Sequence, residues 1–191
     1  MIIALCGFMT AGKTLAGEAL SEKTGKKVID LDRYIEEKEG MKMEDIFSIK
    51  GEPYFRKKEE ECLGQIVETM DDIILSLGGG TPMNPACSEI LRQKTRCIFL
   101  TCSPKVLAAR MLLLQDGRPL VKDLLKGSTA STPEEKLNLL EEWAVKKLKE
   151  REPVYKACSA KTVDTSEWDI ERIVGLILGN GQDHQSIKDD A

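Results

Sequence analysis

The chain of 191 residues contains a single histidine, few aromatic residues (5%) and no long apolar run. Its histidine, His184, lies in a polar stretch near the C-terminus, which excludes a histidine-based catalytic triad in the body of the chain and argues against a structural zinc site. No apolar stretch approaches the roughly 20 residues that a membrane-spanning helix needs. The net charge is only −4, so no overall positive charge would attract nucleic acid or an anionic membrane. We therefore expect a globular protein without nucleic-acid or membrane partners.

The six cysteines show neither a CxxC pair nor the spacing of a disulfide framework. They are Cys6, Cys62, Cys87, Cys97, Cys102 and Cys158. The first residues, Met1–Cys6, lack the positively charged start of a secretory signal peptide and have the composition of a first strand. We therefore expect a cytoplasmic protein whose thiols are reduced and mostly buried.

Five short runs rich in apolar and β-branched residues predict strands, and a segment of helical character follows each of them. These runs are Ile2–Cys6, Lys27–Asp30, Ile73–Leu77, Arg96–Leu100 and Lys161–Asp164. Such alternation is typical of parallel βαβ units, so the fold class is expected to be α/β. The length and the balance of 41% apolar to 31% charged residues suit a single domain over residues 1–180. Residues 181–191 are expected to form a disordered tail.

Several helix boundaries carry physical signals. Ser103 offers an N-cap with a proline directly behind it, and Thr132–Glu135 forms a capping box. Gly25 and Gly40 stand where the preceding helices should end. These signals place helices between most of the predicted strands.

Two segments interrupt the regular alternation. Residues 33–70 hold two or three helices between the second and third strands, which is more than a simple crossover needs. Residues 115–132 are polar and contain glycine, and a long loop inside a compact domain is usually functional or mobile, so we predict a lid there. The core is expected to comprise residues 1–32, 71–114 and 133–178.

The first strand runs into a phosphate-binding sequence. Gly7–Thr14 matches G-x-x-x-x-G-K-[ST], with a plausible helix behind it. Glycines let backbone N–H groups turn inward around a phosphate, Lys13 supplies a positive charge for the β- and γ-phosphates, and the Thr14 hydroxyl ligates Mg²⁺. The expected ATP contacts are Gly7, Thr10, Ala11, Gly12, Lys13, Thr14 and Leu15. The alternative is a plain glycine turn between a strand and a helix, which the position of the motif disfavours.

Two carboxylates follow the second strand, at the edge of the sheet where ligands bind in open α/β folds. Alternation along an extended backbone would point Asp30 and Asp32 to the same side. One carboxylate can then serve the metal shell while the other accepts a hydrogen bond from a substrate hydroxyl. The alternative is that Asp32 merely caps the following helix.

Further short motifs follow in a fixed order. They are Ile46-Phe47, Gly51–Arg56, Leu75–Gly80, Gly117–Leu120, Arg151–Tyr155 and Val163–Thr165. With the phosphate loop and Asp30–Asp32, this series resembles the shikimate kinases over nearly the whole chain. Phe55-Arg56, the triple glycine and Arg151-x-Pro-x-Tyr155 together carry the resemblance. It implies a three-layer P-loop kinase fold in which helices flank a five-stranded parallel sheet, with residues 33–70 as the substrate-binding segment and residues 115–132 as the lid.

On the acceptor side, the resemblance implies that Arg56 and Arg151 grip the shikimate carboxylate, for which a guanidinium is the best planar match. Gly78–Gly80 would let the ring approach the backbone, and Asp32 would orient or deprotonate the attacking hydroxyl. Each position has a plainer alternative: Arg56 as a solvated helix charge, the glycines as a strand-end turn, and Arg151 as a residue favouring a helix end before Pro153.

On the nucleotide side, the resemblance places Asp30 in the magnesium shell and Arg118 over the phosphates, where it would offset charge developing in the transfer. Lys13, Asp32 and Arg118 would be the catalytic residues, and Arg110 a helper near the nucleotide. Two departures stand out. Thr10 replaces a glycine common in the family, so a positive φ at that position is not expected. Ser166–Trp168 follows where many relatives carry an arginine, so the adenine contact is unassigned.

The implied reaction is ATP + shikimate → ADP + 3-phosphoshikimate, a step of chorismate and aromatic amino acid biosynthesis, catalysed with Mg²⁺ by a monomer. Three alternatives are kept. A gluconate or nucleoside monophosphate kinase would share the phosphate loop and the lid arginine. A nucleotide-dependent switch would leave the acceptor residues unexplained, and the chain has no N-K-x-D motif. A catalytically dead relative would have no need of Lys13, Asp32 and Arg118.

Overall fold

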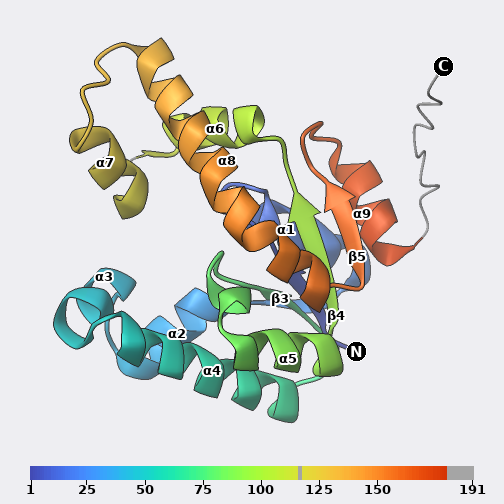
Figure 1. Ribbon diagram of the computed structural model, residues 1–191. Helices are drawn as coiled ribbons and strands as arrows, with labels where there is room; N and C mark the ends of the chain where they lie inside the picture. The colour runs from blue at the N-terminus through green and yellow to red at the C-terminus, as the bar shows by residue number, and fades with distance from the viewer. Residues whose placement is uncertain (116–117, 180–191) are drawn as a thin grey trace.

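The computed structural model describes residues 1–115 and 118–179, and a five-stranded, fully parallel sheet lies at its centre (Figure 1). The strands are β1 Ile3–Cys6, β2 Lys27–Asp30, β3 Ile73–Ser76, β4 Arg96–Thr101 and β5 Lys161–Asp164. Their order across the sheet is β2-β3-β1-β4-β5. Each predicted strand is confirmed to within one residue at either end. The predicted tail at residues 181–191 lies outside the described residues.

Helices connect the strands at nearly every crossover. They are α1 Lys13–Thr24, α2 Leu31–Glu39, α3 Met43–Asp45, a π-helical turn Ile46–Lys50, α4 Glu52–Thr69, a 3₁₀ turn Thr81–Met83, α5 Pro85–Lys94, α6 Pro104–Leu113, α7 Pro119–Lys126, α8 Pro133–Cys158 and α9 Ile170–Leu178. The predicted boundary signals are confirmed: Ser103 caps α6, and Thr132 with Glu135 forms the capping box of α8. Gly25 and Gly40 end α1 and α2 with φ of 72° and 63°.

The sheet separates two apolar cores, which gives the three predicted layers. Because side chains alternate along a strand, Ile3 and Leu5 face one core while Ala4 and Cys6 face the other. Helices α1, α6, α9 and most of α8 cover the first face, and α4 and α5 cover the second (Figure 1). The carboxyl end of the sheet is left to the loops that carry the functional residues.

The segment predicted as a lid loop contains a helix. Pro119 starts α7, and Val121 is buried in the first core while Leu124 and Leu125 pack partly against it. This i, i+3, i+4 spacing gives the segment an apolar face, which a reading based on its polar and glycine residues overlooked. The division of the chain into core, substrate-binding segment and lid stays a prediction.

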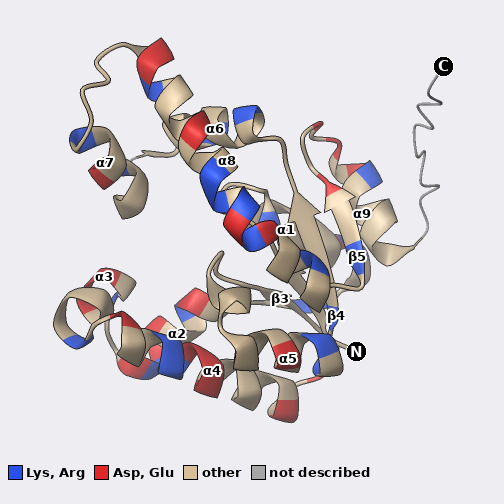
Figure 2. Cartoon of the chain, in the orientation of Figure 1, with Lys and Arg blue, Asp and Glu red and all other residues tan. Residues whose placement is uncertain are grey.

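Helix α8 continues through Pro153 instead of ending before it. Tyr155 and Cys158, beyond the proline, are buried in the second core, and this burial offsets the backbone hydrogen bond that a proline removes. Acidic and basic residues are interspersed along α8 (Figure 2), with Lys156 paired to Glu152 at 2.7 Å.

Over residues 1–115 and 118–179, no helix is long and apolar enough to cross a lipid bilayer.

Candidate active site

The phosphate loop joins β1 to α1 in a tight turn. Lys13 Nζ donates hydrogen bonds to the carbonyl oxygens of Gly7 and Phe8, both at 2.9 Å, so the side chain folds back over the loop. Burial lowers the pKa of Lys13 to about 8. A Cβ on Gly7 would lie 2.4 Å from the Leu100 carbonyl oxygen, so the loop admits only glycine there.

Thr10 adopts a φ of 61°, so the expectation that this β-branched residue would avoid positive φ is wrong. Two contacts hold it there. The Thr10 hydroxyl donates to the Leu107 carbonyl at 3.4 Å, and the Thr10 carbonyl accepts from Arg110 Nη1 at 3.2 Å. A strained backbone persists where the surroundings fix it in this way, and α6 supplies both partners.

A cavity of about 640 Å³ opens beside this loop, at the carboxyl end of the strands. Among its lining residues are most of the predicted site: Thr10, Gly12, Lys13, Thr14, Leu15, Asp30, Asp32, Gly78, Gly79, Arg110 and Arg118. Lining residues that sequence reasoning missed are Met9, Glu18, Ser76, Leu77, Leu114 and Trp168. The predicted residues Gly7, Ala11, Gly80, Arg56 and Arg151 do not line it.

Asp30 and Asp32 both reach the cavity, but not for the reason given by strand alternation. Strand β2 ends at Asp30, and Asp32 lies in the first turn of α2. It is Asp30 that caps this helix, by accepting a hydrogen bond from Arg33 N at 3.1 Å. Burial raises the pKa of Asp32 to about 6, and the nearby charges of Asp30 and Glu59 add to the effect. Asp32 is therefore the carboxyl group better poised to exchange a proton near neutral pH.

The cavity-lining residues at the start of α1 and at the junction of β2 with α2 fit a hard divalent cation. Thr14, Asp30 and Asp32 offer hydroxyl and carboxylate oxygens, the ligand atoms that Mg²⁺ prefers. Burial is the main cause of the raised pKa of Asp32, and the charge of Asp30 adds to it; a bound cation would offset this second effect.

Arg56 lies at the glycine loop that follows β3. Its Nη1 donates to Glu59 Oε2 at 2.8 Å, and its Nε and Nη2 donate to Glu52. Glu59 is buried, and its other oxygen accepts from the Thr81 hydroxyl at 2.6 Å. A Cβ on Gly80 would lie 2.8 Å from Arg56 Nη2, so the guanidinium rests directly against this glycine.

Arg151 reaches the same loop from α8. Its Nη1 donates to the Gly79 carbonyl at 3.5 Å, and its guanidinium carbon lies 5.7 Å from the centre of the Phe8 ring. The Tyr155 hydroxyl, one turn further on, donates to the same Gly79 oxygen at 2.5 Å. The two arginines therefore meet at one glycine loop, although they come from α4 and α8.

Arg110, in α6, and Arg118, the N-cap residue of α7, both line the cavity. Burial lowers the pKa of Arg118, and its Nε has no hydrogen-bond partner within the described part of the chain. Arg110 Nη2 donates to the Thr165 carbonyl at 2.8 Å, and its guanidinium carbon lies 5.3 Å from the centre of the Trp168 ring. A Cβ on Gly12 would lie 2.3 Å from that ring, so Trp168 packs directly against the phosphate loop where it lines the cavity.

Trp168 is the main functional candidate that sequence reasoning left without a role. Its signal was present, because it is one of only two tryptophans and lies in the loop after Val163–Thr165. What was missing is its contact with Gly12 and Arg110, which lie far from it along the chain.

Comparison with known proteins agrees with this geometry. A sequence model of the shikimate kinase family matches residues 9–180. The chain is 35% identical over 180 residues to a shikimate kinase from Flavobacterium psychrophilum, covering 92% of this chain and 98% of that protein. A shikimate kinase structure from Bacteroides thetaiotaomicron superposes with a TM-score of 0.79 at 27% identity, covering 94% of this chain and 97% of the other. A shikimate kinase from Acinetobacter baumannii in complex with shikimate gives a TM-score of 0.73 at 30% identity, covering 94% and 93% of the two chains. The chain therefore belongs to the shikimate kinase family of ATP-dependent kinases.

Proposed function

We propose that the protein transfers the γ-phosphoryl group of ATP to the 3-hydroxyl of shikimate. The meeting of two guanidinium groups at the glycine loop carries the assignment of the acceptor, because a planar carboxylate is what such a pair binds best. The loop also adjoins the phosphate loop, since a Cβ on Gly79 would lie 3.5 Å from the Gly7 oxygen. An acid bound by Arg56 and Arg151 would thus lie next to a nucleotide bound at Gly7–Thr14.

On the nucleotide side, the backbone N–H groups of the phosphate loop and the start of α1 bind the β-phosphate. Lys13 exchanges its bonds to the Gly7 and Phe8 carbonyls for bonds to phosphate oxygens. Arg118 supplies a second positive charge there, and its unpartnered Nε can donate a hydrogen bond to a phosphate oxygen. Both charges stabilise the negative charge that spreads over the transferred group.

Thr14 and Asp30 are the residues that we expect to hold Mg²⁺. When bound, the cation would supply positive charge that offsets the charge of the phosphates. Asp32 then has a separate task, because its raised pKa suits a group that accepts a proton from the attacking hydroxyl.

On the acceptor side, Arg56 and Arg151 hold the carboxylate, and Gly78–Gly80 leave room for the ring against the backbone. Arg56 already donates three hydrogen bonds to Glu52 and Glu59, but a guanidinium has more N–H donors than these. Glu59, which is buried, fixes the orientation of the Arg56 guanidinium. Positioning and electrostatics, with water excluded by the lid, are expected to supply most of the catalysis.

An ADP-release assay tests this function against its rivals. The purified protein is given ATP with shikimate, quinate, gluconate or nucleoside monophosphates, each with and without Mg²⁺. We expect turnover with shikimate and Mg²⁺ only. Preference for gluconate or a nucleoside monophosphate would identify another kinase. ATP binding without any turnover would favour a nucleotide-dependent switch or an inactive relative.

Arg56→Ala separates acceptor binding from nucleotide binding in the same assay. Shikimate affinity should fall while ATP affinity is retained, and unchanged shikimate affinity would remove Arg56 from the site.

That the protein is cytoplasmic and monomeric stays a prediction. Size-exclusion chromatography with light scattering can check the oligomeric state.

A further inference from the structure

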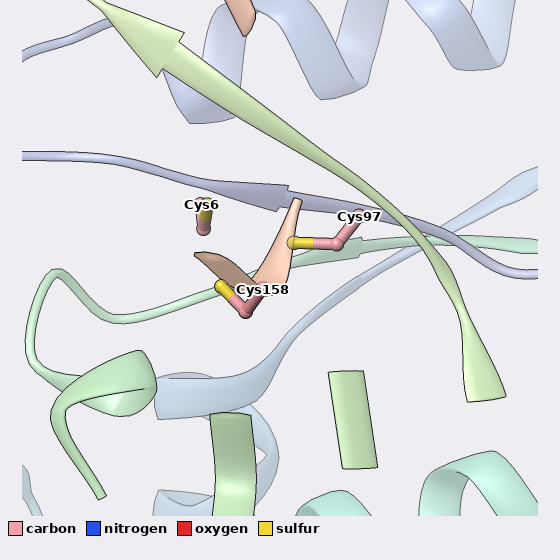
Figure 3. A group of neighbouring side chains, drawn as sticks. All are labelled: Cys6, Cys97 and Cys158. Atoms are coloured by element: carbon pink, nitrogen blue, oxygen red, sulfur yellow. The ribbon is translucent and has the colours of Figure 1, made fainter. Parts of the chain in front are cut away.

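Three buried cysteines gather in the second core, on the side of the sheet away from α1 (Figure 3). Their Sγ atoms all lie within 4.8 Å of one another. Cys6 ends β1, Cys97 lies in β4, and Cys158 is the last residue of α8. Each side chain is at most 2% exposed. All six cysteines of the chain are buried thiols, as expected, but only these three form a group of possible metal ligands within the described residues.

The sheet register explains how the three sulfurs meet. Ala4 pairs with Cys97 and Cys6 pairs with Phe99, so the two cysteines are diagonal neighbours on one face of adjacent strands. Cys158 comes from a distant part of the sequence and lies against the same face, with its sulfur and that of Cys97 turned toward the space beside Cys6 (Figure 3). A trigonal set of sulfurs is thus built on three separate elements.

The Cys158 thiol donates a hydrogen bond to the Tyr155 carbonyl oxygen at 3.4 Å, so its sulfur has a fixed place in the core.

The spacing suits a single soft ion with three sulfur ligands. Zinc–thiolate bonds are about 2.3 Å long, so three sulfurs around an ion of that size lie roughly 4 Å apart, and the three sulfurs here lie within 4.8 Å of one another. Thiolates favour soft ions over hard ones.

The net charge of an ion with its three thiolate ligands limits which ion can bind in this core. Three thiolates around a divalent ion leave a net negative charge, which is unfavourable in an apolar core, whereas three thiolates around a trivalent ion are neutral. Around the cluster lie apolar side chains such as Ala4, Phe99 and Tyr155. A trivalent ion is therefore the better electrostatic match.

We propose that Cys6, Cys97 and Cys158 form a binding site for a soft trivalent ion of the arsenic group, taken up as its neutral hydroxide. For arsenous acid the step is As(OH)₃ + 3 RSH → As(SR)₃ + 3 H₂O. Three As–O and three S–H bonds break, three As–S and three O–H bonds form, and arsenic stays trivalent. No charge enters the core and no oxidant or reductant is needed.

An uncharged reagent can enter when the end of α8 opens. Cys158 lies in the last turn of this helix, beyond Pro153, where one backbone hydrogen bond of the helix is missing. Local opening of helix ends takes less free energy than global unfolding. Uptake should therefore occur in the folded protein, more slowly than with an exposed thiol.

The test uses the full chain, kept reduced with a phosphine and titrated with sodium arsenite. Native mass spectrometry should show one arsenic per chain, with three protons replaced. X-ray absorption at the arsenic edge should count three sulfur neighbours in the unmodified protein. An adduct with fewer than three sulfurs, or no uptake at all, would overturn the proposal without the use of any variant.

Single substitutions then locate the site. Cys97→Ala and Cys158→Ala should each lose stoichiometric uptake, while the matched variants Cys62→Ala and Cys87→Ala, which remove buried thiols elsewhere, should keep it. Uptake retained by Cys97→Ala would place the ion elsewhere. Zinc ions form a separate arm, and Zn²⁺ binding more tightly than arsenous acid would contradict the assignment of a trivalent ion.

Discussion

Lys13 makes two hydrogen bonds to carbonyls of its own loop, and burial makes its charged form less favourable. We therefore expect the charge of Lys13 to serve phosphate binding more than folding. We expect Lys13→Met to lower turnover by at least about a thousandfold, with no decrease in the thermal unfolding temperature. Lys23→Met, at an exposed position of the same helix, is the control in both assays. A loss of stability that matches the loss of activity would show that Lys13 is structural instead.

Glu59 positions Arg56 without lying in the cavity itself. Glu59→Gln keeps the shape of the side chain and a partner for Thr81 but removes the charge from the bond to Arg56. A hydrogen bond between charged groups is stronger than a neutral one by about 1 kcal/mol, so the KM for shikimate should rise roughly fivefold to tenfold. The KM for ATP should change little, as steady-state kinetics can show.

Glu60→Gln is the matched control, because Glu60 is the exposed neighbour on the same helix and contacts Asn84. Equal changes in the KM of both substrates would mean that Glu59 acts on the fold in general, and not on the orientation of Arg56.

Single residues also show where sequence reasoning reaches its limit. The phosphate loop has a local pattern, so its lysine and threonine could be placed from the sequence. The φ of Thr10 depends on Leu107 and Arg110, about a hundred residues away, and no local pattern records such contacts. The role of Trp168 was hidden for the same reason. Residue roles that depend on distant partners appear only in the folded chain.

At the scale of an element, the capping box of α8 gives a pH-dependent prediction. The Glu135 carboxylate accepts hydrogen bonds from Ser131 and Thr132, and these bonds lower its pKa from 4.5 to about 2. Because the pKa of Glu135 is lower in the folded state than in the unfolded state, its ionised carboxylate stabilises the folded protein at pH values above the unfolded-state pKa. This contribution is lost progressively as the pH falls from about 4.5 toward 2.

Glu135→Gln should therefore lower the unfolding temperature near neutral pH, and the difference from the parent protein should shrink below about pH 4.5. Calorimetry over a pH series measures this. Glu134→Gln, in the same first turn but outside the capping box, controls for the helix dipole. A difference that stays constant down to acidic pH would contradict the assigned bonds.

Elements with clear end signals were predicted well, and those stabilised by tertiary burial were not. Helix α7 was missed because its apolar face is short and lies between glycine-bearing stretches. The continuation of α8 past Pro153 could not be predicted, because only the burial of Tyr155 and Cys158 compensates for the missing hydrogen bond.

For the whole molecule, ligand binding should appear as added stability, because only the folded chain forms the cavity. Mg²⁺-ADP at about 100 times its Kd stabilises the folded state by about 2.7 kcal/mol, which for a chain of this size is a rise of roughly 5–10 °C in Tm. Differential scanning fluorimetry measures it, and Lys13→Met should largely lose the shift. A full shift in that variant would place the nucleotide away from the phosphate loop.

The parallel sheet could be predicted from the alternation of strands and helices, but the strand order could not be read from that pattern alone. The order β2-β3-β1-β4-β5 puts β1 at the centre, so the phosphate loop stands between β3, which leads into the glycine loop, and β4, which leads into α6 and α7. Eight motifs in a fixed order indicated the candidate site, and the fold explains why their spacing along the chain is uneven, because the strand order differs from the chain order.

Helix α8 is one unbroken helix of 26 residues, about 39 Å long, that starts where the lid segment ends and carries Arg151 and Tyr155 near its other end. Because Arg151 lies before Pro153, a displacement of the first turns moves the Arg151 guanidinium as well, unless the helix bends ahead of it. If α8 moves as a rigid body, binding of nucleotide and binding of acid are thermodynamically linked, and each substrate then changes the affinity for the other by the same factor.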